Sequence, residues 1–374
     1  MLATPLEWLD ITRIACAFAV SLVLCIGLIP KINYIARSKG LLNHPDTRTS
    51  HRYGTPNFGG VSVFLAFTVA FMLFLKCDTI LAQNFKYLSL SFLFIFFVGL
   101  KDDIMVMSAE KKLMAQIFVA VLLVYGGIHF TNLHGLFNIG ELNELTSVIL
   151  STFVIIVLIN AFNLIDGIDG LASLLGSIIL TVFGFWFYIN HIIDWAVICF
   201  SMVGALFAFF FFNVYGLRNK TFLGDSGSLL LGLVVAAVVI QFNESNLNPL
   251  LPYRFLSAPA VSFGIIILPV VDVARVFFIR ILEGHSPFAA DKNHFHHRLL
   301  DLGCSHIQAT FVLCGVSAIF IGVSLLMNSC GILKLLAVLV GMVLIFIAIL
   351  EYLHYKWMKK KEKEMRTFVS HDDV

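Results

Sequence analysis

The sequence predicts an all-α membrane protein with about eleven transmembrane helices, because apolar runs long enough to cross about 30 Å of hydrocarbon recur along the chain. Hydrophobic residues make up 59% of the chain and charged residues only 13%, whereas a soluble domain carries about 25% charge. The mean hydropathy is +0.93. The predicted spans are 9–35, 58–75, 86–100, 113–130, 147–162, 169–189, 194–215, 225–243, 257–281, 307–328 and 331–357.

The positions of lysine and arginine predict the orientation of these helices. Successive loops alternate between the two sides of a membrane, and cytoplasmic loops carry an excess of Lys and Arg. One set of loops holds only Lys76, Lys86 and Arg254. The other set holds the basic residues within 37–52, 101–112, 218–220, 292–298 and 356–366. We therefore expect a periplasmic N-terminus and a cytoplasmic C-terminus.

The same pattern predicts the domain organisation. Because no linker interrupts the succession of spans, we expect one polytopic domain over residues 1–355. Residues 356–374 form a basic cytoplasmic tail suited to anionic lipid. The net charge of only +2, without basic and aromatic residues interleaved, excludes a nucleic-acid partner.

Acidic residues and histidines gather on the predicted cytoplasmic side. Carboxylates at membrane depth are costly and therefore indicate function. Singly, each motif has a structural interpretation as a helix cap or a turn, but their recurrence on one side favours a functional site. The motifs are GLKDD (99–103), NAFNLIDGIDGL (160–171), TFLGDSGSLLLG (221–232) and DKNHFHHRLLDLG (291–303).

The residue types in these motifs predict a site for a diphosphate and a metal ion. Oxygen ligands such as Asp225 and Asn163 suit Mg²⁺, with Mn²⁺ as a substitute. Glycines beside the aspartates allow backbone N–H groups to approach an anion. A zinc site is the competing interpretation, but no cysteine accompanies the histidines and the H-E-x-x-H spacing is missing. Positive charge comes from Arg52, Lys112, His297 and Arg298.

In this order, the four motifs resemble the polyprenyl-phosphate N-acetylhexosamine-1-phosphate transferases, and the resemblance covers residues 10–350. The H-x-H-H spacing resembles the bacterial branch that starts O-antigen, enterobacterial common antigen, capsule or teichoic-acid-type glycans. The resemblance implies a bacterial inner-membrane enzyme in which undecaprenyl phosphate attacks the β-phosphate of a UDP-N-acetylhexosamine and releases UMP. It also implies Mg²⁺ bridging the diphosphate oxygens.

The resemblance further implies roles for individual residues. Asp225 and Asn163 would hold the metal, Phe222 would stack on the uracil, and Asp169 would hydrogen-bond near it. The implied catalytic residues are Asp102, Asp103 and Asp166. The remaining implied substrate-binding residues are Arg52, Lys112, Asn160, His294, His296, His297 and Arg298.

Several alternatives stay open at this stage. UDP-GlcNAc is the default donor, with UDP-GalNAc and deoxy-amino sugars such as FucNAc or QuiNAc as alternatives. Attack can be direct or pass through a covalent aspartyl intermediate. A transporter would place its carboxylates near mid-span, and an intramembrane metallopeptidase would need a zinc signature. Related enzymes suggest a homodimer.

Overall fold

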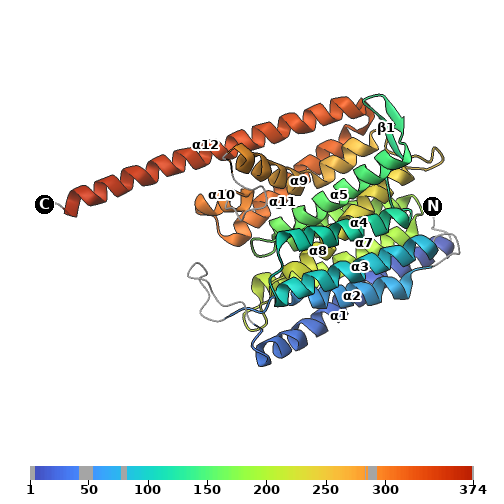
Figure 1. Cartoon of the computed structure of the whole chain (residues 1–374), viewed down its shortest axis with the longest axis horizontal. Helices are drawn as coiled ribbons and strands as arrows, with labels where there is room; N and C mark the ends of the chain where they lie inside the picture. Colours follow the sequence, from blue (N-terminus) through green and yellow to red (C-terminus); the bar gives the residue numbers. More distant parts are fainter. Residues whose placement is uncertain (1–4, 42–53, 77–81, 283, 285–292, 373–374) are drawn as a thin grey trace.

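The computed structural model describes residues 5–41, 54–76, 82–282, 284 and 293–372, and it shows a bundle of long helices running side by side (Figure 1). A helix lies in each of the ranges predicted from the apolar runs, which confirms the all-α class. The described helices are α1 (Pro5–Ser38), α2 (Gly59–Phe74), α3 (Ala82–Ile104), α4 (Ala109–Tyr125), α5 (Glu144–Ile165), α6 (Leu171–Ile189), α7 (Ile193–Tyr215), α8 (Gly224–Ser245), α9 (Ala258–Leu282), α10 (Phe295–Asp301), α11 (His306–Leu326) and α12 (Ile332–Asp372), with a 3-10 turn η1 (Asn328–Cys330).

Among the described helices, seven are long and apolar enough to cross a membrane: α1, α5, α6, α7, α8, α11 and α12. The helices α2 and α4 are shorter, with 16 and 17 residues. Together these features make the chain a multi-pass helical membrane protein.

The structure differs from the sequence prediction at two helix ends. The predicted span 113–130 stops at Tyr125, because Gly126 and Gly127 turn the chain, the latter at φ +84°. A hairpin of β1 (Asn132–Leu136) and β2 (Ile139–Glu141) follows, and the sequence analysis did not predict it. At the other extreme, α12 continues without a break through the predicted tail to Asp372 and projects beyond the bundle (Figure 1).

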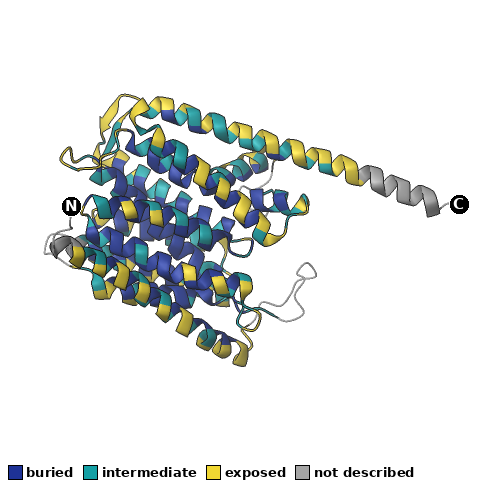
Figure 2. Cartoon of the chain, turned by 180° about the vertical axis from the view of Figure 1, so that it is seen from behind, coloured by how far each residue is buried: buried dark blue, intermediate teal, exposed yellow. Residues whose placement is uncertain are grey.

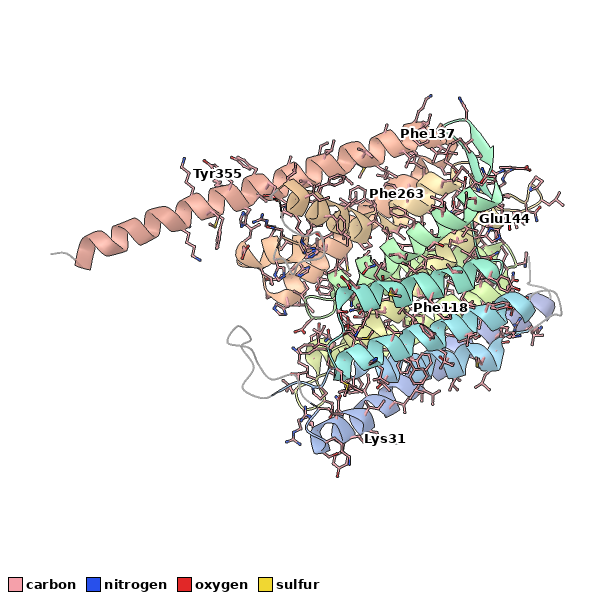
Figure 3. All side chains as sticks on the ribbon, viewed as in Figure 1. Lys31, Phe118, Phe137, Glu144, Phe263 and Tyr355 are labelled. Atoms are coloured by element: carbon pink, nitrogen blue, oxygen red, sulfur yellow. The ribbon has the colours of Figure 1, made fainter. Side chains whose placement is uncertain are left out.

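The centre of the bundle is α8, which is 89% buried over its most apolar stretch, whereas α1 and α12 are 22% and 17% buried. Figure 2 shows the buried residues concentrated in the middle and the exposed ones on the outer faces. Many exposed side chains are large and apolar, such as Phe118 on α4, labelled in Figure 3. An apolar outer face is what a helix in contact with lipid presents.

Close backbone contacts hold the start of α8 against α2 and α3. A Cβ atom on Gly99 of α3 would lie 2.5 Å from the carbonyl oxygen of Asp225, and one on Gly60 of α2 would lie 2.3 Å from the nitrogen of Gly227. Only glycine permits such an approach, as in other tightly packed membrane helices. The position of Asp225 relative to the end of α3 is therefore fixed by packing.

The described parts of the four motifs meet at one end of the bundle, the end at which α10 lies in Figure 1. There the segment before α2 pairs with the segment before α8: Phe222 N donates to Pro56 O at 3.0 Å, and Gly59 N donates to Phe222 O at 2.9 Å. The opposite end has its own contacts, including Arg13 to Asp194 at 2.8 Å. The fold thus collects residues from α3 to α10 into one polar region.

Candidate functional site

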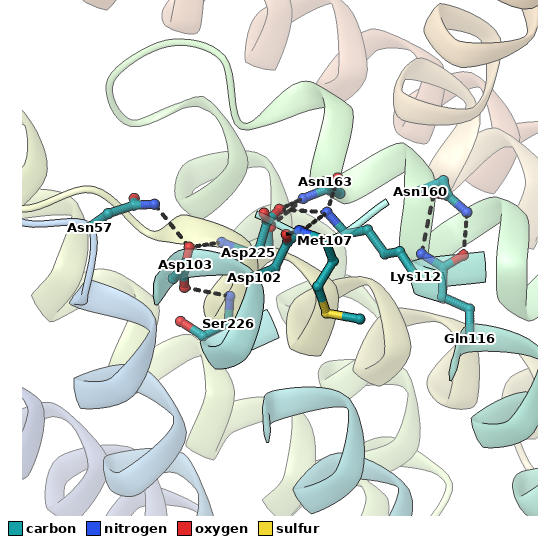
Figure 4. A network of polar contacts seen from close by, with 11 residues as sticks. Asn57, Asp102, Asp103, Met107, Lys112, Gln116, Asn160, Asn163, Asp225 and Ser226 are labelled. Atoms are coloured by element: carbon teal, nitrogen blue, oxygen red, sulfur yellow. Dashed lines mark hydrogen bonds and ion pairs between the residues drawn. The ribbon is translucent and has the colours of Figure 1, made fainter. Parts of the chain in front are cut away.

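The centre of this region is the Lys112 cluster, which we define as Lys112, Asp102, Asn163 and Asp225 (Figure 4). The Lys112 ammonium lies 2.8 Å from Asp102 Oδ2 and 3.0 Å from Asp225 Oδ1. It also donates to Asn163 Oδ1 at 3.4 Å. Asn163 in turn donates to Asp225 and, at 3.0 Å, to Ser228 Oγ. Three oxygen atoms from α3, α5 and α8 therefore converge on one cation.

The donor set of this cluster fits a hard divalent cation. Two carboxylates face one ammonium, so the cluster keeps a net negative charge. Mg²⁺ is usually bound by one or two carboxylates, with water and substrate phosphates completing its octahedron. Among the residues that the structure describes, no group of three or more His, Cys, Asp or Glu side chains could hold a metal ion. The Lys112 cluster offers an amide oxygen in addition to its two carboxylates.

Asp103 faces a different way from its neighbour Asp102. Its carboxylate accepts hydrogen bonds from the backbone N–H groups of Asp225 and Ser226, at 2.8 and 2.9 Å, and from the Asn57 side chain at 2.8 Å (Figure 4). Leu223, at the N-cap position of α8, has no side-chain oxygen, so Asp103 performs the capping role from another helix. Asp103 thereby positions Asp225, a function that the sequence analysis did not predict.

Asn160 lies one turn before Asn163 on α5 and pairs with Gln116, one turn after Lys112 on α4. Each amide donates to the other, at 2.7 and 3.3 Å. This pair fixes the alignment of α4 and α5 directly beside the Lys112 cluster. A contact of Asn160 with substrate stays a prediction.

Asp166 ends α5 and is half-buried. Burial raises its pKa well above the ordinary value, and the negative charges of Asp225, Asp103 and Asp169 add to this effect. A raised pKa makes the ionised carboxylate a stronger proton acceptor. This property agrees with the predicted catalytic role, which stays a prediction.

Asp169 belongs to a second group, with Lys220, Phe222 and His306. Lys220 Nζ lies 2.7 Å from Asp169 Oδ2 and 5.8 Å from the centre of the Phe222 ring, and His306 Nδ1 lies 3.5 Å from the same carboxylate oxygen. Burial alone would raise the pKa of Asp169. The hydrogen bonds and charges of His306 and Lys220 outweigh burial and lower it. Lys220 thus connects the two residues predicted to recognise the nucleotide.

The histidines of the fourth motif stack at the start of α10. The rings of His294 and His296 lie 5.7 Å apart and nearly parallel, and His297 lies 4.3 Å from His296. His296 is only 1% exposed. Within the described part of the chain, neither of its ring nitrogens has a hydrogen-bond partner. Since an unpaired buried polar group costs about 1–3 kcal/mol, this arrangement agrees with the predicted substrate-binding role of His296, which stays a prediction.

His296 packs against the loop between Asp166 and Asp169. A Cβ atom on Gly167 would lie 2.3 Å from His296 Nε2. Burial lowers the pKa of His296 to about 3, and His297, His294 and His306 contribute further. The ring is therefore neutral at physiological pH and offers hydrogen-bonding groups without a charge.

The low pKa of His296 predicts an acid-sensitive fold. Because the unfolded chain binds this proton near pH 6.5, stability is complete above that pH and falls as the pH drops toward about 3. We expect the melting temperature of the purified protein to fall more steeply between pH 7 and pH 4 than that of His296→Gln. His191→Gln, at an exposed histidine outside the polar region, is the control. Equal slopes for all three proteins would contradict this assignment.

Arg298 points toward α12. Its Nη2 donates to Asn293 Oδ1 at 2.9 Å, its Nη1 lies 3.2 Å from His354 Nε2, and its Nε lies 3.7 Å from Glu351. Arg298 therefore ties α10 to α12 in this structure, and its predicted contact with substrate stays a prediction. Arg52 lies outside the described residues.

The chain is similar in sequence to a family of known enzymes. Residues 85–243 match the family described as glycosyl transferase family 4. An undecaprenyl-phosphate alpha-N-acetylglucosaminyl 1-phosphate transferase of Escherichia coli K12 is 28% identical over 288 residues, which are 76% of this chain and 75% of the relative. The protein of that name from Yersinia pestis is 29% identical over 76% of each chain. These matches support the resemblance of the chain to the polyprenyl-phosphate hexosamine-1-phosphate transferases of this family.

A mycobacterial relative gives the same result. The decaprenyl-phosphate N-acetylglucosaminephosphotransferase of Mycobacterium tuberculosis is 29% identical over 303 residues, which are 75% of this chain and 74% of the relative. The family match over 85–243 includes the Lys112 cluster, Asp103, Asp166, Asp169 and Phe222. The histidine run lies outside that match.

The sequence analysis assigned no role to several polar residues of this site. Lys220 and His306 hold Asp169, and Asn57 holds Asp103. None of the three is part of an acidic or histidine motif, so motif reading gave no signal for them. A buried carboxylate on α9, Asp272, also contacts the histidine run. In the sequence, Asp272 stands in PVVDVAR among the acidic residues of the predicted cytoplasmic side, inside an apolar run where a charged residue is costly, but it was assigned no role.

Proposed function

We propose that the protein transfers an N-acetylhexosamine-1-phosphate, with GlcNAc-1-phosphate as the first candidate, from a UDP-sugar to undecaprenyl phosphate. An oxygen of the lipid phosphate attacks the β-phosphorus, the bond from that phosphorus to the bridging oxygen breaks, and UMP leaves. The lipid then carries a diphospho-sugar that starts a cell-surface glycan such as O-antigen, capsule or a teichoic-acid-type polymer. UDP-GalNAc and deoxy-amino sugars are the alternative donors.

The convergence of three oxygen atoms on the Lys112 ammonium supports this proposal most strongly. Phosphoryl transfer depends mainly on positioning and on neutralising the charge of the phosphate oxygens. A cluster that holds a cation among carboxylates is suited to this task. Lys112 can contact a phosphate directly, while Asp103 holds Asp225 in place through the start of α8.

Mg²⁺ is the metal that the oxygen donors of this cluster fit best. Asp225 and Asn163 would hold it, as the sequence analysis predicts. When bound, Mg²⁺ supplies Lewis-acid charge neutralisation at the diphosphate. Asp102 forms an ion pair with Lys112 and accepts a hydrogen bond from Met107 N at 2.5 Å. It would orient the lipid phosphate.

The nucleotide belongs beside the second group. Phe222 offers an aromatic face for the uracil, and Asp169 offers carboxylate oxygens that can accept from its N3–H group. The bond from Lys220 keeps that carboxylate ionised and in place. The sugar and the diphosphate then lie toward His296, whose ring nitrogens have no hydrogen-bond partner among the described residues and can bind an oxygen atom.

Asp166 is the proposed proton acceptor because it ends α5 three residues after Asn163, and because burial and the charges of Asp225, Asp103 and Asp169 raise its pKa. Direct attack by the lipid phosphate needs only one displacement at phosphorus. A covalent aspartyl-phosphate route needs two displacements. In the covalent route the phosphosugar can be transferred to an aspartate before the lipid is added, and in the direct route it cannot.

The membrane arrangement is part of the same proposal. We propose about eleven crossings, since each long helix matches an apolar run suited to the bilayer. The polar end of the bundle would face the cytoplasm, where nucleotide sugars occur, in the inner membrane of a bacterium. Residues 1–355 would form the transferase domain, and 356–374 a basic tail, here the end of α12. A homodimer stays a prediction.

A reaction with purified protein tests the proposal. Detergent-purified protein receives undecaprenyl phosphate, Mg²⁺ and, in separate reactions, UDP-GlcNAc, UDP-GalNAc, UDP-QuiNAc and UDP-FucNAc. We expect one sugar to give lipid product and UMP in equal amounts, and EDTA to reduce the rate to background until excess Mg²⁺ or Mn²⁺ restores it. Transfer that is unaffected by EDTA would contradict the metal assignment. UMP release without lipid product would contradict the acceptor.

A further inference from the structure

Asp272 is a buried carboxylate on α9 that the proposed reaction does not use. Its side chain is 3% exposed, and that of His294, its partner, is 5% exposed. A charged group inside an apolar helix is costly and therefore indicates a function. The residues that it contacts show what that function is. Asp272 contacts the start of α10 and therefore lies at the polar end of the bundle.

Both oxygen atoms of Asp272 are engaged with α10. Oδ1 accepts the backbone N–H of Phe295 at 2.9 Å, and Oδ2 lies 3.1 Å from His294 Nδ1. A carboxylate accepts but does not donate, so Nδ1 of His294 carries a proton in this contact. Asp272 therefore fixes the position of the α10 start and also the tautomer and orientation of one imidazole.

The orientation of the His294 ring bears on that of His296, because the two rings stack. The two rings are nearly parallel, with an angle of 5° between them, and His296 meets Gly167 with no room for a Cβ atom. Gly167 lies between Asp166 and Asp169, the residues proposed to accept a proton and to bind the nucleotide. A path of direct contacts thus runs from Asp272 through the histidines to the loop of the site.

Resting on the proposed function, we propose that Asp272 is a positioning residue for the transfer reaction, acting through His294 to hold His296 against the loop that carries Asp166 and Asp169. Arg275, one turn further on α9, supports the same segment by donating to the carbonyl of Asn293 at 2.5 Å and by pairing with Glu351. The start of α10 is therefore held by neighbouring charged residues of α9.

Asp272→Asn tests this role with little change in shape. The amide keeps one oxygen for the Phe295 N–H, but its NH₂ group then faces His294 and demands the opposite tautomer. We expect kcat/KM for the UDP-sugar to fall about 10- to 100-fold, as when other groups that orient an active-site histidine are replaced. The KM for undecaprenyl phosphate should change less than twofold, and the melting temperature should stay within about 2 °C of the wild type.

A double-mutant cycle separates positioning from simple stabilisation. If Asp272 acts through His294, then the double variant Asp272→Asn/His294→Gln loses no more activity than the worse single variant. Asp194→Asn is the matched control, because that carboxylate also forms an ion pair, with Arg13, but at the other end of the bundle. It should keep wild-type kinetics.

Two results would overturn this inference. One is a wild-type kcat/KM in Asp272→Asn. The other is a double variant whose fold-loss in activity equals the product of the fold-losses of the two single variants. If Asp272→Asn does not fold, His294→Gln decides: full activity contradicts the inference, and a lower kcat/KM with an unchanged KM for undecaprenyl phosphate and an unchanged melting temperature supports it. A wild-type protein that makes no lipid product contradicts the proposed function itself, so the two failures are distinguishable.

Discussion

Asp225→Asn is expected to reduce transfer at least about 100-fold in a protein that stays folded, since a bound metal supplies several kcal/mol and each 1.4 kcal/mol is a factor of ten. The amide keeps the size of the carboxylate and can still meet Asn163, but it removes one of the two negative charges facing Lys112. The backbone N–H of residue 225 still binds Asp103, so the start of α8 remains capped.

The measurement is the initial rate of lipid-linked product together with the melting temperature, over a range of Mg²⁺ concentrations. Asp194→Asn, which changes a carboxylate at the opposite end of the bundle, is the control and should be fully active. An Asp225→Asn protein with more than half of the wild-type rate would exclude this residue as a metal ligand. A loss of activity that excess Mg²⁺ partly restores would support the assignment.

Asp103→Ala is expected to lower the stability of folding by about 3 kcal/mol or more, because an unsatisfied buried donor costs about 1–3 kcal/mol. Three donors lose their acceptor: the N–H groups of Asp225 and Ser226 and the side chain of Asn57. Asp103→Asn keeps one acceptor oxygen and should be the milder change. Thermal unfolding in detergent, with the yield of folded protein, measures both effects.

Asp102→Ala provides the comparison for this prediction. It is the adjacent residue, but its carboxylate forms an ion pair with Lys112 and accepts a hydrogen bond from Met107. We expect Asp102→Ala to lose activity with a smaller decrease in melting temperature than Asp103→Ala. The reverse order, with Asp103→Ala as stable as the wild type but inactive, would show that Asp103 acts in the reaction and is not needed as a cap.

Much of the fold could be predicted because hydropathy decides where a helix can cross a bilayer. The helix ranges followed from runs of apolar residues, and each contains a helix. The β1–β2 hairpin did not follow, since it depends on positive φ angles at Phe137 and Asn138 that neither residue type requires. The length of α12 was also missed, because its charged end lacks the apolar signal used to find spans.

The sequence could predict which residues belong to the candidate site, but not how their side chains are arranged. Loops on one side of a membrane are neighbours, so the carboxylates and histidines could be assigned to one region. Adjacent helical residues point about 100° apart, so Asp102 and Asp103 had to face different partners. Which one faces Lys112 depends on how α3 is rotated against α8, and that is decided by the contact at Gly99. The link from Asp272 to His294 depends likewise on tertiary packing.

The most direct test of phosphosugar transfer uses UDP-GlcNAc, or the preferred donor from the panel, labelled with ³²P in the β-phosphate. The wild-type protein, undecaprenyl phosphate and Mg²⁺ are mixed, and lipid and nucleotide fractions are separated over time. If the bond to the bridging oxygen breaks, the label enters the lipid and unlabelled UMP is released. If the label stays in the nucleotide as UDP while the sugar reaches the lipid, the protein transfers the sugar alone, and the reaction proposed for the Lys112 cluster is wrong.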